Sequence, residues 1–147
     1  MYDENIYRRA RMSAGLTQER AAEKLGISVE SIKAYESYTR LPPFDVVDGM
    51  VIVYDTQYLA YQHTRIVSGA VKVVPEVEQL DLPRAALRLI NKTMAFADKR
   101  RDRDLLAIAE DGVIDEAERP LFEAIVTELD ELIKAALELK ISREAEP

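Results

Sequence analysis

The stretch from Leu16 to Tyr38 constrains the fold of this chain most, because it carries two helix signals separated by one tight turn. Thr17 is a preferred N-cap residue, and helix-forming residues follow it up to Leu25. Gly26 then stands where a helix C′ residue adopts a left-handed conformation, which glycine does at low cost. Ser28 can cap a second helix. The stretch therefore predicts two short helices that meet at a sharp turn.

This spacing is typical of a helix-turn-helix. The pattern continues on both sides of the turn, as Arg11-x-x-x-Gly15-Leu16-Thr17-Gln18, Ala22-Glu23-Lys24-Leu25-Gly26-Ile27-Ser28 and Ser31-Ile32-Lys33-x-Tyr35-Glu36. Over roughly residues 5–60 it resembles the DNA-binding domain of phage repressor and Cro-type (XRE-like) regulators. The resemblance implies a five-helix DNA-binding domain at residues 1–66 and a phage or prophage origin.

Three further helices are expected to complete this domain. The first covers residues 4–14, with Ile6, Tyr7, Ala10 and Met12 at its apolar positions. The next covers residues 44–54, with Asp45 as its N-cap; its β-branched residues also allow a strand. A short closing helix covers residues 57–65. His63 is the only histidine, and a packing or surface role is expected for it.

The resemblance also implies which residues meet double-stranded DNA, since a recognition helix presents its first turn to base edges in the major groove. Val29 can contact a thymine methyl group, and Glu30 can accept a hydrogen bond from cytosine. Glu30 also suits the helix N-terminus without any DNA. The full expected set is Thr17, Gln18, Ser28, Val29, Glu30, Ser31, Lys33, Ala34 and Arg40. Arg11 and Glu36 match the positions of a structural ion pair in this family.

Composition argues against an enzyme and against a membrane protein. The 147 residues include no cysteine and one histidine, with no glycine-rich phosphate loop and no repeated metal-ligand spacing. We therefore expect no catalytic residue, no metal and no cofactor. No apolar run approaches the roughly 20 residues that span a bilayer, and the N-terminus lacks the apolar core of a signal peptide. A cytoplasmic location is expected.

The net charge of −7 leaves an alternative to DNA binding open. Residues 1–65 hold 8 Lys and Arg against 9 Asp and Glu, whereas residues 66–147 hold 12 against 18, so the acidity lies mostly in the second half. A near-neutral first half can still bind DNA through local charge. The alternative is a degenerate helix-turn-helix that acts as a protein–protein adaptor without binding DNA.

A change in the spacing of apolar residues along the chain indicates a second domain. Residues 67–81 contain Ser68-Gly69 and Pro75 and are expected to form a linker, in which Val71–Val74 can be extended. Residues 82–147 show helical periodicity, interrupted by the mixed-charge run 98–104, which we expect to stay helical although its like-charged i,i+4 pairs allow a break. A turn at residues 111–115 and a capping box at Asp115 and Glu118 precede the last helix. An antiparallel helical hairpin is therefore expected, and the whole protein is predicted to be all-α.

The last helix has a wider apolar stripe than one partner helix covers. Two copies of a regulator commonly read one palindromic site, so this stripe is expected to form a homodimer. The alternative is a compact monomer whose hairpin folds back on the N-terminal domain and covers the stripe. The expected interface residues are Phe122, Ile125, Leu129, Leu132, Ile133, Ala136 and Leu139.

Overall fold

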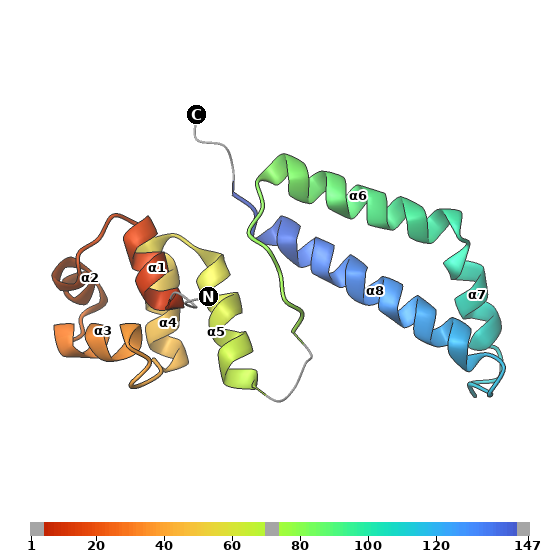
Figure 1. The fold of residues 1–147 in the computed structure, drawn as a ribbon, viewed down its shortest axis with the longest axis horizontal. Coiled ribbons are helices and arrows are strands. Elements are labelled where there is room, and N and C mark those ends of the chain that lie inside the picture. The colour runs from red at the N-terminus through yellow and green to blue at the C-terminus, as the bar shows by residue number, and fades with distance from the viewer. Residues whose placement is uncertain (1–4, 70–73, 144–147) are drawn as a thin grey trace. The chain divides into compact units, whose positions relative to one another are not determined.

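The structure is a computed structural model, and it describes residues 5–69 and 74–143. It divides into two compact units, residues 1–74 and 75–147 (Figure 1). All eight elements in the described residues are helices, as the sequence predicts. The expected extended arm at Val71–Val74 falls almost entirely outside the described residues.

Five short helices form the first unit around one apolar core. They are α1 (Ile6–Ser13), α2 (Gln18–Leu25), α3 (Val29–Glu36), α4 (Phe44–Tyr54) and α5 (Gln57–Ser68). The core is built from residues of all five helices, namely Ile6, Tyr7, Ala21, Ala22, Ile32, Tyr35, Val47, Met50, Val51, Tyr54 and Leu59. Gly49 lies where α4 meets α2: a Cβ there would stand 3.2 Å from Leu25 Cδ2, so the close approach explains a glycine inside a helix.

Several local expectations for the first unit need correction. Residues 44–54 form a helix and not a strand, but Pro43 is its N-cap residue and Asp45 lies in its first turn. Met12 is half exposed, because it lies on the side of α1 that faces away from the core. The closing helix runs three residues further than expected, to Ser68, and so includes the first residues of the expected linker.

The second unit is a hairpin of α6 (Leu82–Asp98) and α8 (Arg119–Lys140), with α7 (Arg101–Ile108) between them. Helices α6 and α8 lie side by side and run in opposite directions (Figure 1). The helix expected to continue through the mixed-charge run is broken, because Arg100 adopts a left-handed conformation with φ 54°. The expected capping box forms: Asp115 Oδ1 accepts from the Glu118 backbone N–H, and Glu118 Oε2 accepts from that of Asp115.

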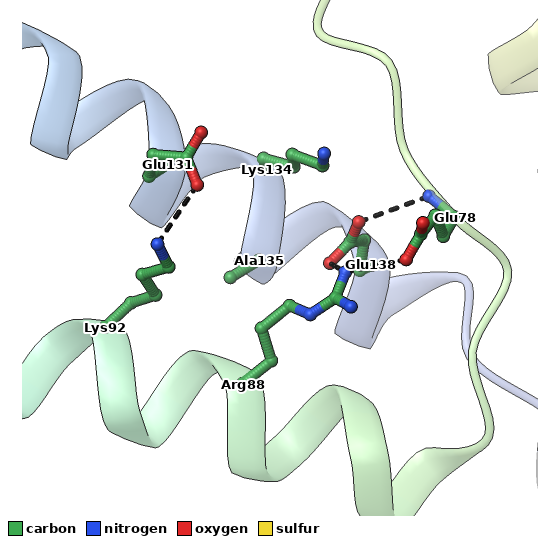
Figure 2. Close-up of a pocket in the computed structure, with 7 residues that line it drawn as sticks. All are labelled: Glu78, Arg88, Lys92, Glu131, Lys134, Ala135 and Glu138. Atoms are coloured by element: carbon green, nitrogen blue, oxygen red, sulfur yellow. Dashed lines mark hydrogen bonds and ion pairs between the residues drawn. The ribbon is translucent and has the colours of Figure 1, made fainter.

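Ion pairs join α6, α8 and the segment before α6 along one side of the hairpin (Figure 2). Glu138 is fully buried, and its carboxylate accepts from the Glu78 backbone N–H at 3.2 Å and from Arg88 Nη1 at 2.8 Å. Lys92, one helical turn after Arg88, pairs with Glu131. These groups line a pocket of about 300 Å³. Arg88 pairs with Glu78 and Glu138, and Lys92 pairs with Glu131, so each carboxylate of the cluster has a cationic partner. The cluster is therefore an ion-pair network that joins α6 to α8.

Candidate nucleic-acid interface

The two helices of the motif begin and end at the residues that the sequence indicates. Thr17 Oγ1 accepts from the Arg20 backbone N–H at 3.1 Å, and Ser28 Oγ accepts from that of Ser31 at 3.1 Å. Gly26 closes α2 with φ 65°. The Ile27 backbone N–H then bonds the Ala22 carbonyl at 3.1 Å, and the Ile27 side chain packs against the core. These bonds fix the angle at which α3 leaves α2.

A largely buried polar network holds α3 against α1. Arg11 Nε lies 2.5 Å from Glu36 Oε1, and Arg11 Nη2 donates to Glu36 Oε2 at 2.9 Å. Arg11 Nη1 also donates to the Leu16 carbonyl at 2.6 Å. The hydrogen bond to Glu36 raises the pKa of Arg11, so the guanidinium stays charged. Gln18 Nε2 donates to Glu36 Oε2 at 2.9 Å, which ties the start of α2 to the end of α3.

Helix α3 has a buried side and an open side. Ile32 and Tyr35 are buried in the core, whereas Glu30 and Lys33 are exposed. Val29 and Ala34 are half-buried, and Val29 packs partly against the core. Val29 therefore offers less side-chain surface for contact with a DNA base than a fully exposed residue would. The open side therefore presents one acidic and one basic side chain.

Arg40 returns to the recognition helix from the loop that follows it. Arg40 Nη2 donates to Ser31 Oγ at 2.9 Å, and its guanidinium carbon lies 5.1 Å from the centre of the Tyr35 ring. Ser31 Oγ is also hydrogen-bonded to Ser28 Oγ at 3.0 Å. The structure thus gathers Ser28, Ser31 and Arg40 at the first turn of α3, whereas Gln18 is engaged with Glu36.

The family comparison agrees with this geometry. Residues 8–58 match a family model described as helix-turn-helix. The N-terminal unit is a helix-turn-helix domain. A domain of this type indicates a DNA-binding transcription regulator and is not typically enzymatic. Neither the search of curated proteins nor the search of solved structures found a match to the chain.

The sequence did not predict the contacts of two residues of the helix-turn-helix domain, Asn5 and Tyr38. Asn5 caps α1, and its Nδ2 donates to the Tyr35 carbonyl at 2.8 Å, so it ties the start of α1 to the recognition helix. Tyr38, just after α3, has φ 55°, and its hydroxyl accepts from the Ile6 backbone N–H at 3.2 Å. Asn before a helix is a capping signal; no local signal gives the contact of Tyr38 with α1.

The expected dimer residues of α8 have unequal access to solvent. Ile133 is half exposed, whereas Ile125 is fully buried inside the hairpin and cannot meet a second chain without rearrangement. The others are partly buried.

Among the described residues, no group of three or more His, Cys, Asp or Glu side chains is arranged to hold a metal ion. No helix in that part of the chain is long and apolar enough to cross a membrane.

Proposed function

We propose that this protein is a transcription regulator that binds a palindromic DNA site as a homodimer, with α3 in the major groove. The observation that carries the proposal is the helix-turn-helix match over residues 8–58, together with an α3 whose outer side remains open. The family match favours DNA binding over the adaptor alternative. Two copies are invoked because one recognition helix contacts only a few base pairs.

The residues of the proposed interface divide into those that contact bases and those that contact phosphates. Glu30 accepts from cytosine N4, and the exposed part of Val29 contacts a thymine methyl group beside Ala34. Lys33 and Arg40 neutralise phosphates. Thr17, Ser28 and Ser31 stand at helix N-termini, where hydroxyl and backbone N–H groups can bind phosphate oxygens. Gln18 uses one amide hydrogen in its bond to Glu36 and can offer the other to a phosphate. Arg40 is held in position by the Tyr35 ring and by Ser31.

The test is selection of bound fragments from genomic DNA with the purified full chain, followed by sequencing. We expect a shared palindrome with half-sites about one helical turn apart, 10–10.5 bp. Glu30→Gln should change the preference at one base pair of each half-site, and Lys33→Ala should weaken binding to all sequences. Lys140→Ala, which removes an exposed lysine from the second unit, is the matched control. Absence of any enriched sequence at low salt would favour the adaptor alternative.

A further inference from the structure

The carboxylate of Glu36 bonds to residues of two other helices. Arg11 of α1 contacts both of its oxygens, with Nε 2.5 Å from Oε1 and Nη2 2.9 Å from Oε2. Gln18, the first residue of α2, donates from Nε2 to the same Oε2 at 2.9 Å. An ion pair between α1 and α3 needs no third partner, so the pair itself does not explain the bond to Gln18.

The bond to Glu36 fixes the orientation of the Gln18 amide. A carboxylate that pairs with an arginine only accepts hydrogen bonds, whereas an amide has an NH2 group that donates and an oxygen that accepts. The NH2 group of Gln18 must therefore face Glu36, and one of its two hydrogens is used there. The second Nε2 hydrogen belongs to a half-buried side chain that is still partly open to solvent. Because phosphate oxygens also only accept, this hydrogen is the one that suits a phosphate.

Arg11 allows a carboxylate to lie close to a phosphate contact. A carboxylate without a cationic partner would repel the phosphate, but the guanidinium of Arg11 stands in direct contact with Glu36 and offsets its charge at longer range. The Glu36 side chain is also only 5% exposed. Arg11 Nη1 donates in addition to the Leu16 carbonyl at 2.6 Å, just before α2 begins. Arg11 and Glu36 together hold both the backbone and the Gln18 side chain at the start of α2.

We propose that Glu36 is a positioning residue for DNA binding, because it holds the Gln18 amide in the orientation that donates a hydrogen bond to a backbone phosphate. The inference rests on the proposed function and deepens it, since it gives Glu36 a part in the DNA contact beyond the ion pair. The bond between Gln18 and Glu36 is present without DNA. The Gln18 side chain therefore does not have to be ordered when DNA binds, which lowers the entropic cost of the contact.

The test is a double-mutant cycle on the DNA affinity of the full chain, with a fragment recovered in the genomic selection. Gln18→Met keeps the length of the side chain without its amide and should weaken binding about tenfold. Glu36→Gln can present either end of its own amide to Gln18, so the orientation of Gln18 is no longer fixed. Glu36→Gln should therefore weaken binding at least about threefold more in the parent chain than in a chain that carries Gln18→Met.

The cycle separates positioning from a structural role, because a loss of structure at Glu36 would change the affinity equally in both backgrounds. Glu19→Gln is the matched control: it removes an exposed carboxylate next to Gln18 and should have the same effect in both backgrounds. Equal effects of Glu36→Gln in the two backgrounds would overturn the inference alone. A parent chain that does not bind DNA would contradict the proposed function and, with it, the inference.

Nuclear magnetic resonance of the parent chain tests the same inference if Glu36→Gln unfolds the domain. The two Nε2 hydrogens of Gln18 are assigned by their loss in Gln18→Met. Without DNA, one of them should exchange with water more slowly than those of the exposed Gln57, because it is bonded to Glu36. The resonance of the other should shift when DNA is added. Exchange of both as fast as in Gln57, or a second hydrogen that does not respond to bound DNA, would overturn the inference.

Discussion

At the scale of single residues, the Arg11–Glu36 pair is the interaction whose loss should cost most in the first unit. The side chains are only 9% and 5% exposed, so removing one leaves the other charged and poorly solvated. Arg11→Ala and Glu36→Ala should each lower the free energy of unfolding by about 3 kcal/mol or more. The double variant should lose less than the sum, because it leaves no orphaned charge. Strict additivity in urea unfolding would contradict a coupled pair.

His63 gives the first unit a dependence on pH. It is buried, its Nδ1 lies 2.8 Å from the Tyr7 hydroxyl, and burial lowers the pKa of His63 below its ordinary 6.5. The unfolded chain therefore binds a proton more readily than the folded chain. The stability due to neutral His63 should be complete above pH 6.5 and should be lost as the pH falls from there toward the folded-state pKa. In melting experiments between pH 7.5 and 5, His63→Gln should show a flatter pH dependence; an unchanged slope would contradict this role.

At the scale of elements, the break between α6 and α7 depends on one residue in a left-handed conformation. Arg100 has φ 54°, which costs a non-glycine residue about 1 kcal/mol, and its ion pair with Asp102 is exposed. Arg100→Gly should therefore raise the stability of the second unit by up to about 1 kcal/mol. Asp102→Ala, which removes the ion pair but keeps the backbone residue, should change stability little. Destabilisation by Arg100→Gly in thermal unfolding would show that the side chain, and not the backbone, determines the break.

The same elements show which features the sequence could predict. The caps at Thr17, Ser28 and Asp115 and the turn at Gly26 depend on neighbouring residues, and the structure has each of them. Next to the break at Arg100, Arg101 pairs with Glu128 from a distant part of the chain, a contact that the local sequence does not predict. Helix α6 likewise packs through a side that its sequence alone does not identify, since Leu87, Ile90 and Met94 are more than half exposed whereas Ala85 is fully buried. Its apolar residues occupy two sides, and the spacing alone does not say which side meets α8.

The candidate site also has some features that the sequence predicts and others that depend on the assembled fold. The open position of Lys33 follows from the helical period, because Ile32 and Tyr35 must face the core. The return of Arg40 to Ser31 and Tyr35 depends on the path of the loop through Pro42 and Pro43, which no periodicity fixes. The resemblance alone indicates a phosphate contact for Gln18, and the bond of Gln18 to Glu36 forms only when three helices are assembled.

At the scale of the whole molecule, the uneven charge predicts opposite responses to salt. DNA binding by the first unit should weaken as salt rises, since each phosphate contact releases counterions. Association of two copies through the second unit should become stronger as salt rises. Residues 66–147 carry a net negative charge, so two copies repel each other, and salt screens that repulsion. Sedimentation and DNA titration over one salt series should show both trends. A dimer that dissociates as salt rises would instead indicate an interface held by ion pairs.

The most direct test of the account is the salt dependence of DNA binding, by fluorescence anisotropy with a fragment recovered in the genomic selection. For the parent chain, the logarithm of the binding constant should fall linearly with the logarithm of the salt concentration. Lys33→Ala should reduce that slope by about 1 for each recognition helix engaged, whereas Lys140→Ala should leave it unchanged. Equal slopes for the parent chain and Lys33→Ala, or no binding at low salt, would contradict a DNA interface on α3.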